Sequence, residues 1–199
     1  MSGPPQIVMA SQNEGKCREF ARILDSFQVL SLSEFSAIDF PEEGGDYVAN
    51  ARVKAATAAK EIGLPAVADD SGLEVEFLDG APGPYSARLG GPGLDDRGRV
   101  DFLLDLLQDA PSPRRARFFC AAACVWPDGR FEEAQGVCRG EILFEPQGEK
   151  GFGYDPIFRA ESESRAMAEL CVEEKDALSH RGKAFRALAD RIRVAMRPA

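Results

Sequence analysis

The sequence Ala66-Val67-Ala68-Asp69-Asp70-Ser71-Gly72-Leu73-Glu74-Val75 joins a short apolar run to two carboxylates, a hydroxyl, a glycine and a second, alternating run. The apolar run predicts a buried β-strand, and Ser71-Gly72 predicts the break after it. Because ligands gather at the carboxyl ends of strands in α/β folds, Asp69 and Asp70 are candidates for binding a divalent cation. Carboxylate oxygens suit Mg²⁺, which also touches substrate phosphates. The alternative is a turn in which one aspartate only caps backbone N–H groups.

Strand and helix patterns alternate in the first part of the chain. We expect a buried strand at 7–10, a polar loop at 11–16 leading into a helix, and a second strand at 28–32. The segment from Asp46 to about Ile62 predicts a long helix, because its alanines favour helix and Gly63-Leu64-Pro65 ends it.

The second part of the chain predicts a hairpin and two more helices. A half-exposed strand at 73–77 precedes a long loop at 78–88, and a helix is expected at 94–107. Asp128-Gly129 lies between two strand-like runs, 117–126 and 130–144, which is typical of a β-hairpin. Gly136 and Gly140 indicate a bulge or bend in its second arm. Ser179 is the expected N-cap of the last helix.

Length and charge limit the possible functions. The 199 residues are enough for one domain with a substantial core, so we expect 1–199 to form a single domain. A net charge of −9 argues against polymeric nucleic acid as a partner. No apolar run approaches the ~20 residues needed to cross a bilayer, so no membrane association is expected.

The cysteines indicate a reducing compartment. They are odd in number and include no Cys-x-x-Cys pair: Cys17, Cys120, Cys124, Cys138 and Cys171. Reduced thiols in the cytoplasm are therefore expected rather than a zinc site or disulfides, with Cys120 and Cys124 in a strand core. The start, Met1-Ser2-Gly3-Pro4-Pro5, lacks the basic and apolar regions of a signal peptide.

Two lysines are candidate phosphate ligands. The loop Ser11-Gln12-Asn13-Glu14-Gly15-Lys16 carries a lysine at a helix start, where phosphate groups bind, although a plain surface turn explains it equally well. Lys54 lies one helical turn after Asn50 on the same face, and either reaches a phosphate or is solvated.

Two later segments are candidates for contacts with a base. Glycines on both sides of Phe152 allow a flat group to approach, so Phe152 or Tyr154 either stacks on a base or packs in the core. His180, the sole histidine, lies in a basic cluster with Arg181 and Lys183. Basic residues in a first helical turn oppose the helix dipole, and such broken local rules are expected at functional sites.

Six motifs, taken together and in order, resemble the inosine triphosphatase family, the purine NTP pyrophosphatases that act on dITP, ITP and XTP. They are Ser11-x-Asn13-x-x-Lys16, Asn50-Ala51-x-x-Lys54-Ala55, Ala68-Asp69-Asp70-Ser71-Gly72-Leu73, Gly80-Ala81-Pro82-Gly83-x-Tyr85-Ser86-Ala87-Arg88, Gly151-Phe152-Gly153-Tyr154-Asp155-Pro156-x-Phe158 and Ser179-His180-Arg181-Gly182. The resemblance covers nearly the whole chain.

The resemblance implies a fold, a reaction and roles for individual residues. It implies an elongated two-lobed α/β fold, a mixed β-sheet flanked by helices with the active site in the cleft between lobes. It also implies a homodimer and Mg²⁺-dependent cleavage of purine NTPs to NMP and pyrophosphate. Asp70 matches the general base, which also takes part in metal binding. In such a reaction Lys16 and Lys54 are the expected catalytic cations, because with Mg²⁺ they would stabilise the charge on the leaving group. Asp69 is then a second metal contact or an orienting partner, and Glu42 is a further metal ligand. Implied substrate contacts are Ser11, Gln12, Asn13, Glu14, Gly15, Lys16, Ser71, Phe152, Gly153, Tyr154, Asp155, Lys175, His180 and Arg181.

The chain departs from the family pattern before the long helix. The family has Glu-Glu-Thr-Gly-x-Thr-Phe-x-Glu-Asn-Ala, and Ala49 here replaces the acid before Asn50. Either Glu42 or Glu43 then faces the metal, and Glu42 is favoured. Two other functions stay open: a Maf-type pyrophosphatase with another nucleotide preference, and a nucleotide-binding module that has lost catalysis.

Overall fold

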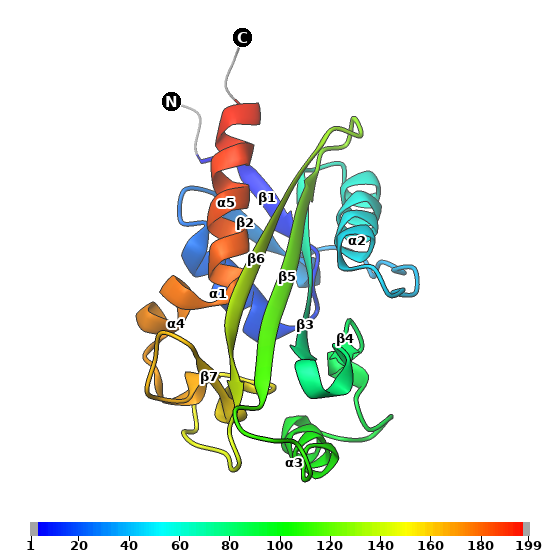
Figure 1. The fold of residues 1–199 in the computed structure, drawn as a ribbon. Helices are drawn as coiled ribbons and strands as arrows, with labels where there is room; N and C mark the ends of the chain where they lie inside the picture. Colours follow the sequence, from blue (N-terminus) through cyan, green and yellow to red (C-terminus); the bar gives the residue numbers. More distant parts are fainter. Residues whose placement is uncertain (1–3, 197–199) are drawn as a thin grey trace. The chain divides into compact units, whose positions relative to one another are not determined.

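The computed structural model describes residues 4–196, and the strands among them belong to one mixed β-sheet (Figure 1). The strands are β1 (Gln6–Met9), β2 (Gln28–Ser31), β3 (Ala66–Val75), β4 (Pro82–Gly83), β5 (Arg115–Val125), β6 (Phe131–Ile142) and β7 (Phe158–Ala160). The helices are α1 (Glu14–Ile23), α2 (Tyr47–Ile62), α3 (Asp96–Leu106), α4 (Val172–Leu178) and α5 (His180–Ala195). The strand order is β2-β1-β3-β5-β6-β7, with β4 paired to β3. β1 is parallel to both β2 and β3, whereas β4 pairs antiparallel with β3 and β7 pairs antiparallel with β6. The expected α/β class with a mixed sheet is therefore confirmed.

The chain divides into two compact units, and each has its own hydrophobic core. Among the described residues, unit 1 comprises 4–70, 120–136 and 180–196, and unit 2 comprises 71–119 and 137–179. Phe20 and Phe185 meet edge to face in the core of unit 1, and Phe118 and Phe158 pack together in that of unit 2. The expectation of one two-lobed domain over 1–199 stays a prediction.

The long helix α2 begins and ends where its sequence predicts. Asp46 is its N-cap, and the Asp46 side chain accepts the backbone N–H of Val48 at 2.8 Å and of Ala49 at 3.1 Å. Gly63 ends the helix with a left-handed φ of 75°, a conformation that glycine adopts without steric cost. The segment that departs from the family pattern therefore still starts this helix in the ordinary way.

The predicted break at Ser71-Gly72 is wrong, because β3 runs without interruption from Ala66 to Val75. β1 pairs only with the first residues of β3, with Met9 opposite Val67. Asp69 and Asp70 thus lie in the middle of a strand, just past the carboxyl end of its neighbour β1. The turn interpretation of the two aspartates is also wrong, while their position at the carboxyl end of a parallel strand, β1, fits the expectation for ligand sites.

Smaller differences occur at other element ends. The strand expected at 73–77 ends at Val75, and Glu76–Leu78 form a 3₁₀ turn. The helix expected at 94–107 is α3, which Asp95 caps. Ser179 is the C-cap of α4 and directly precedes α5, and its expected role as the N-cap of α5 stays a prediction. The hairpin is confirmed, with Gly129 at φ 87° in the turn between β5 and β6.

The bulge expected at Gly136 or Gly140 is absent from the described strand β6, which keeps one register with β5 from end to end. Both glycines instead serve close backbone approach. A Cβ on Gly136 would fall on the backbone oxygen of His180 and lie 2.7 Å from the nitrogen of Ala184. A Cβ on Gly140 would fall on the backbone oxygen of Arg159 in β7. The glycines therefore let α5 and β7 approach β6 more closely than any other residue would allow.

Gly136→Ala is expected to lower the free energy of unfolding by about 2–3 kcal/mol, because the added methyl meets rigid helix backbone. Urea unfolding of the variant and of the wild type measures this. Gly63→Ala is the comparison: it meets no atom within 4 Å, so its cost is the left-handed φ alone, roughly 1 kcal/mol. A Gly136→Ala protein as stable as the wild type would contradict the close approach.

All five cysteines are free thiols, and Cys120 and Cys124 are buried in the core of unit 1, as expected. In the part of the chain that the structure describes, no helix is both long and apolar enough to cross a membrane. The absence of a signal peptide was inferred partly from Met1 to Gly3, which lie outside the described residues.

Candidate active site

Asp69 is buried in unit 1 between two basic side chains. It is 2 % exposed, and its Oδ2 lies 3.0 Å from Lys16 Nζ and 3.6 Å from Arg181 Nε. Arg181 Nη1 also donates to Glu19 Oε2 at 3.1 Å, and Glu19 is itself buried on α1. The contacts form a row of alternating charge that ties β3 to the start of α1 and to the start of α5.

The loop before α1 positions Lys16. Asn13 caps the helix, and its side chain accepts the backbone N–H of Lys16 at 3.0 Å. Ser11 Oγ accepts the backbone N–H of Asn13 at 3.2 Å, which fixes the turn after β1. The loop also borders a cavity of about 620 Å³ in unit 1, lined by Ser11, Gln12, Glu14 and Cys17 with residues of the 31–40 segment. Lys16 is thus an ordered lysine, only 16 % exposed, rather than a solvated surface residue.

Asp70 is held from the α2 side by an amide and an ammonium group. Asn50 Nδ2 donates to Asp70 Oδ2 at 2.8 Å, and the same amide both donates to and accepts from the backbone of Gly44 at 2.8 Å. Lys54 Nζ lies 3.9 Å from Asp70 Oδ1 and donates to Glu43 Oε1 at 2.6 Å. The helix face carrying Asn50 and Lys54 therefore ties Asp70 to the acidic turn at 43–44.

Burial sets the protonation of this pair. Desolvation raises the pKa of Asp70, although the Asn50 hydrogen bond and Lys54 both oppose this shift. Burial also disfavours the charged form of Lys54, but Asp69, Glu43 and Asp70 outweigh it and raise the pKa of that lysine. Lys54 is therefore a cation at neutral pH, and Asp70 is a stronger base than an exposed aspartate.

The oxygen donors here suit a hard divalent cation. Asp69, Asp70 and the acidic turn supply only carboxylate oxygens, and the Lys54 ammonium bridges two of these carboxylates. Within residues 4–196, no group of three or more histidine, cysteine and acidic side chains is close enough to hold a metal ion. Mg²⁺ commonly takes only one or two carboxylates and completes its shell with water and substrate phosphates, so the donor set fits that ion.

The second group of expected residues lies in unit 2. Asp155 and Lys175 are both buried and form an ion pair at 2.7 Å, while Asp155 also accepts the backbone N–H of Phe152 at 2.9 Å. Lys175 Nζ lies 4.7 Å from the centre of the Phe152 ring, within the range of a cation–π contact. Gly153 is fixed by its N–H, which donates to Asp96 at 2.8 Å.

Tyr154 is a core residue of unit 2. Its hydroxyl donates to the backbone oxygen of Ser86 at 2.8 Å, and burial raises its pKa. Of the two aromatic candidates for stacking on a base, only the half-buried Phe152 keeps part of its surface exposed.

Ser71 follows Asp70 in β3 and is half-buried, and His180 is 1 % exposed at the start of α5.

Three residues near the aspartates were not among the expected site residues: Asn50, Glu43 and Glu19. Asn50 had a signal, because it is a buried amide one turn before Lys54 on an otherwise apolar helix face. Glu43 was an alternative to Glu42 as the acid that faces the metal, and the sequence around them does not distinguish the two. In the structure Glu42 is exposed. Glu19 is a polar residue next to the core residue Phe20, and only the fold reveals that it meets Arg181.

Residues 7–191 match the sequence model of the Ham1 family. The chain belongs to the Ham1 family. The resemblance predicted from the six motifs is thereby confirmed. A dITP/XTP pyrophosphatase of Bacillus cereus is 44 % identical over 198 residues, covering 96 % of this chain and 97 % of that protein. A dITP/XTP pyrophosphatase of Deinococcus deserti is 47 % identical over 184 residues, covering 92 % and 87 %.

Solved structures of Ham1 proteins have the same fold. A HAM1 protein from Coxiella burnetii matches with a TM-score of 0.86 and 41 % identity, covering 96 % of this chain and 99 % of that one. The Ham1 protein of Staphylococcus aureus matches with a TM-score of 0.85 and 38 % identity, with the same coverage. The Ham1 assignment replaces the Maf-type alternative.

Proposed function

We propose that the chain is a nucleoside triphosphate pyrophosphatase that converts the non-canonical purine nucleotides dITP, ITP and XTP to NMP and pyrophosphate and so sanitises the nucleotide pool. Relatives named dITP/XTP pyrophosphatase, matched over nearly their full length, support the reaction class. The observation that carries the proposal is the burial of Asp70 against Asn50 and Lys54, beside the Asp69–Lys16 ion pair.

In this proposal Asp70 orients and deprotonates the attacking water. Its raised pKa makes it a better base than an exposed aspartate. Lys16 and Lys54 bind the phosphates and stabilise the charge that develops on the pyrophosphate leaving group. Phosphate contacts are proposed for the loop Ser11, Gln12, Asn13, Glu14 and Gly15, and a substrate contact for Ser71.

Cleavage in this family is generally metal-dependent, and we propose Mg²⁺ as the cofactor. When bound, the ion would supply Lewis-acid stabilisation of the phosphate oxygens. Asp70 is the first proposed ligand, with Asp69 or Glu42 as the second carboxylate, since no three acidic side chains within residues 4–196 are close enough to hold an ion. Glu43 is already bound to Lys54, so its proposed role is to position that lysine, whereas the exposed Glu42 lies next to it in the same acidic turn.

Glu42→Gln and Glu43→Gln form a matched pair that tests this division of roles. Glu42→Gln is expected to raise the Mg²⁺ concentration needed for half-maximal rate by about tenfold, as loss of a charged ligand would. Glu43→Gln is expected to raise KM instead, because Lys54 loses its carboxylate partner. Mg²⁺ titrations at saturating dITP measure the first effect, and dITP titrations at saturating Mg²⁺ measure the second. The opposite assignment of effects would make Glu43 the ligand.

Base recognition is proposed for residues of two segments. Phe152 stacks on the base, and Asp155 and Lys175 hold the Phe152–Asp155 loop in place together with Gly153 and Tyr154. His180 or Arg181 donates a hydrogen bond to O6 of hypoxanthine or xanthine. Adenine presents an amino group there, so donor would face donor, and a site built this way rejects the wrong base strongly.

A panel of nucleotides assayed for released pyrophosphate, with and without Mg²⁺, tests the proposed function. We expect dITP, ITP and XTP to be cleaved with kcat/KM at least about 10²-fold above that for dATP, and only with the metal. Preference for canonical or pyrimidine nucleotides would contradict the proposal. Binding of ITP without turnover would identify a nucleotide-binding module that has lost catalysis.

We also propose a cytoplasmic homodimer that binds neither polymeric nucleic acid nor membranes. The free thiols fit a reducing compartment, and the net charge of −9 disfavours association with a polyanion. Sedimentation velocity measures the oligomeric state directly.

A further inference from the structure

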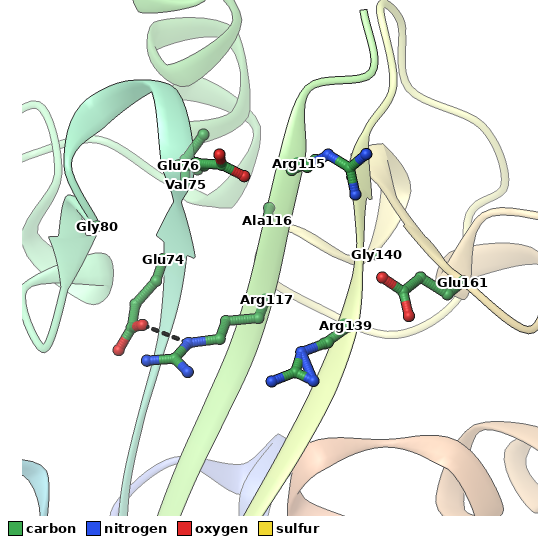
Figure 2. A pocket seen from close by; sticks show the side chains of 10 residues that line it. All are labelled: Glu74, Val75, Glu76, Gly80, Arg115, Ala116, Arg117, Arg139, Gly140 and Glu161. Carbon is green, nitrogen blue, oxygen red and sulfur yellow. Dashed lines mark hydrogen bonds and ion pairs between the residues drawn. The ribbon is translucent and has the colours of Figure 1, made fainter.

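One face of the sheet in unit 2 is charged and exposed. Leu73, Ala116, Phe118 and Cys138 belong to the core of the unit, so the residues between them in β3, β5 and β6 point to the opposite face. On that face lies a cavity of about 270 Å³ (Figure 2). Its charged lining consists of Glu74, Glu76, Arg115, Arg117, Arg139 and Glu161.

The strand register brings two of the arginines directly opposite each other. The backbone N–H of Ile142 donates to the backbone oxygen of Arg114, and that of Trp126 donates to the backbone oxygen of Arg130. Residues that face each other across the β5–β6 ladder therefore have residue numbers that add up to 256 at both ends of the ladder. The residue numbers of Arg117 and Arg139 also add up to 256, so these two residues face each other on neighbouring strands. Figure 2 shows their side chains projecting from neighbouring strands to the same side.

Carboxylates stand only at the two ends of this row. Arg117 Nε donates to Glu74 Oε2 at 2.6 Å on the β3 side. Glu161 lies opposite Arg139 on the other side, because its N–H donates to the Arg139 oxygen. The described residues nevertheless provide no ion pair or side-chain hydrogen bond for the Arg139 guanidinium, and none for the terminal nitrogens of Arg117. Two neighbouring cations therefore form the centre of a row with the charges −, +, +, −.

Like charges directly opposite on a sheet destabilise it, and an anion between them removes that repulsion. Two guanidinium groups also match the geometry of an oxyanion, which accepts several parallel N–H donors. We propose that Arg117 and Arg139 bind a small oxyanion of the phosphate type at this face of unit 2. The site goes beyond the proposed function, since none of its residues belongs to the proposed substrate-binding or catalytic groups.

A second copy of the chain centred on this row would not neutralise the two arginines. A two-fold axis through the middle of the row would superpose − + + − on itself, so that arginine faces arginine and glutamate faces glutamate. Such an arrangement is repulsive rather than complementary. A free oxyanion needs only the central pair.

The test follows the side-chain Nε–H signals of ¹⁵N-arginine-labelled protein during titration with inorganic phosphate at constant ionic strength. Signals of Arg117 and Arg139 are expected to shift and saturate. Those of Arg130, an exposed arginine bonded to Asp128, are the matched control and should not saturate. Reading these signals separates the site from phosphate bound at Lys16 or Lys54.

Arg139→Gln is expected to weaken the phosphate affinity reported by Arg117 at least tenfold, the effect of one charge-assisted hydrogen bond. Without phosphate the variant should melt at the same temperature as the wild type or above it, because the repulsion between the two arginines is gone. Phosphate should raise the melting temperature of the variant less than that of the wild type. Arg130→Gln should change neither the phosphate affinity reported by Arg117 nor the effect of phosphate on the melting temperature. Unsaturated shifts, wild-type affinity in Arg139→Gln, or a changed oligomeric state with unchanged phosphate affinity would overturn the proposal.

Discussion

Asp70→Asn is expected to lower kcat for dITP by about 10²–10⁴-fold, the usual effect of losing a general base. The amide keeps the size and the hydrogen-bonding oxygen that Asn50 contacts, but it cannot take a proton from water. Pyrophosphate release under saturating dITP and Mg²⁺ measures the loss. Asp128→Asn, in the exposed β5–β6 turn, is the matched control and should keep the wild-type rate.

The same substitution should not destabilise the fold at pH 7. Because burial raises the pKa of Asp70 in the folded chain, the folded state binds its proton more tightly than the unfolded state does. Ionised Asp70 therefore costs stability above the folded pKa, and the cost disappears as the pH falls below the ordinary value of 3.8. In metal-free buffer, Asp70→Asn should melt at or above the wild-type temperature at pH 7. An inactive variant that is also unfolded would leave Asp70 with a structural role, and an active one would exclude it as the base.

Asp155→Ala is expected to lower the free energy of unfolding by about 3–5 kcal/mol, the range for breaking a buried ion pair from one side. The change removes the carboxylate 2.7 Å from the buried Lys175 ammonium and the acceptor of the Phe152 N–H. Urea unfolding measures the difference. Asp101→Ala removes an exposed acid on α3 of the same unit and is the comparison, with an expected change within about 0.5 kcal/mol.

A double-mutant cycle with Lys175→Met separates the ion pair from the rest of the Asp155 contacts. Removing both charges leaves neither one buried alone, so the double variant should be more stable than the sum of the single losses predicts. Additive losses would show that Asp155 stabilises the loop through the Phe152 N–H and not through Lys175.

Elements with a strong local signal were predictable from the sequence. The long helix was found because Asp46 and Gly63 bound an alanine-rich segment, and the hairpin because Asp-Gly separates two strand-like runs. Asp69 and Asp70 were candidates because they end an apolar run, and Lys16 and Lys54 because of their positions on predicted helices. The order of the motifs in the family then supported all four. The structure brings all four into one group of contacts in unit 1.

Features that depend on tertiary contacts were not predictable. Ser71-Gly72 resembles a break, yet β3 continues there and pairs directly afterwards with β4, at Leu73 and Glu74. Gly136 predicted a bulge or bend that the regular strand β6 does not have, because the local sequence cannot show that α5 packs against this glycine. Glu19 and Arg181 are far apart in the chain, so no spacing rule joins them.

The position of Asp69 and Asp70 inside β3 also affects how the protein loses function on heating. Catalytic groups on a surface loop can be lost by local opening while the rest of a domain stays folded. Here the backbone of both carboxylates belongs to a ten-residue strand of the sheet, and both residues are buried. Opening that strand means opening the sheet. On heating, catalytic activity and the folded state should therefore be lost together. Amide hydrogen exchange in β3 should be as slow as in the most protected part of the core.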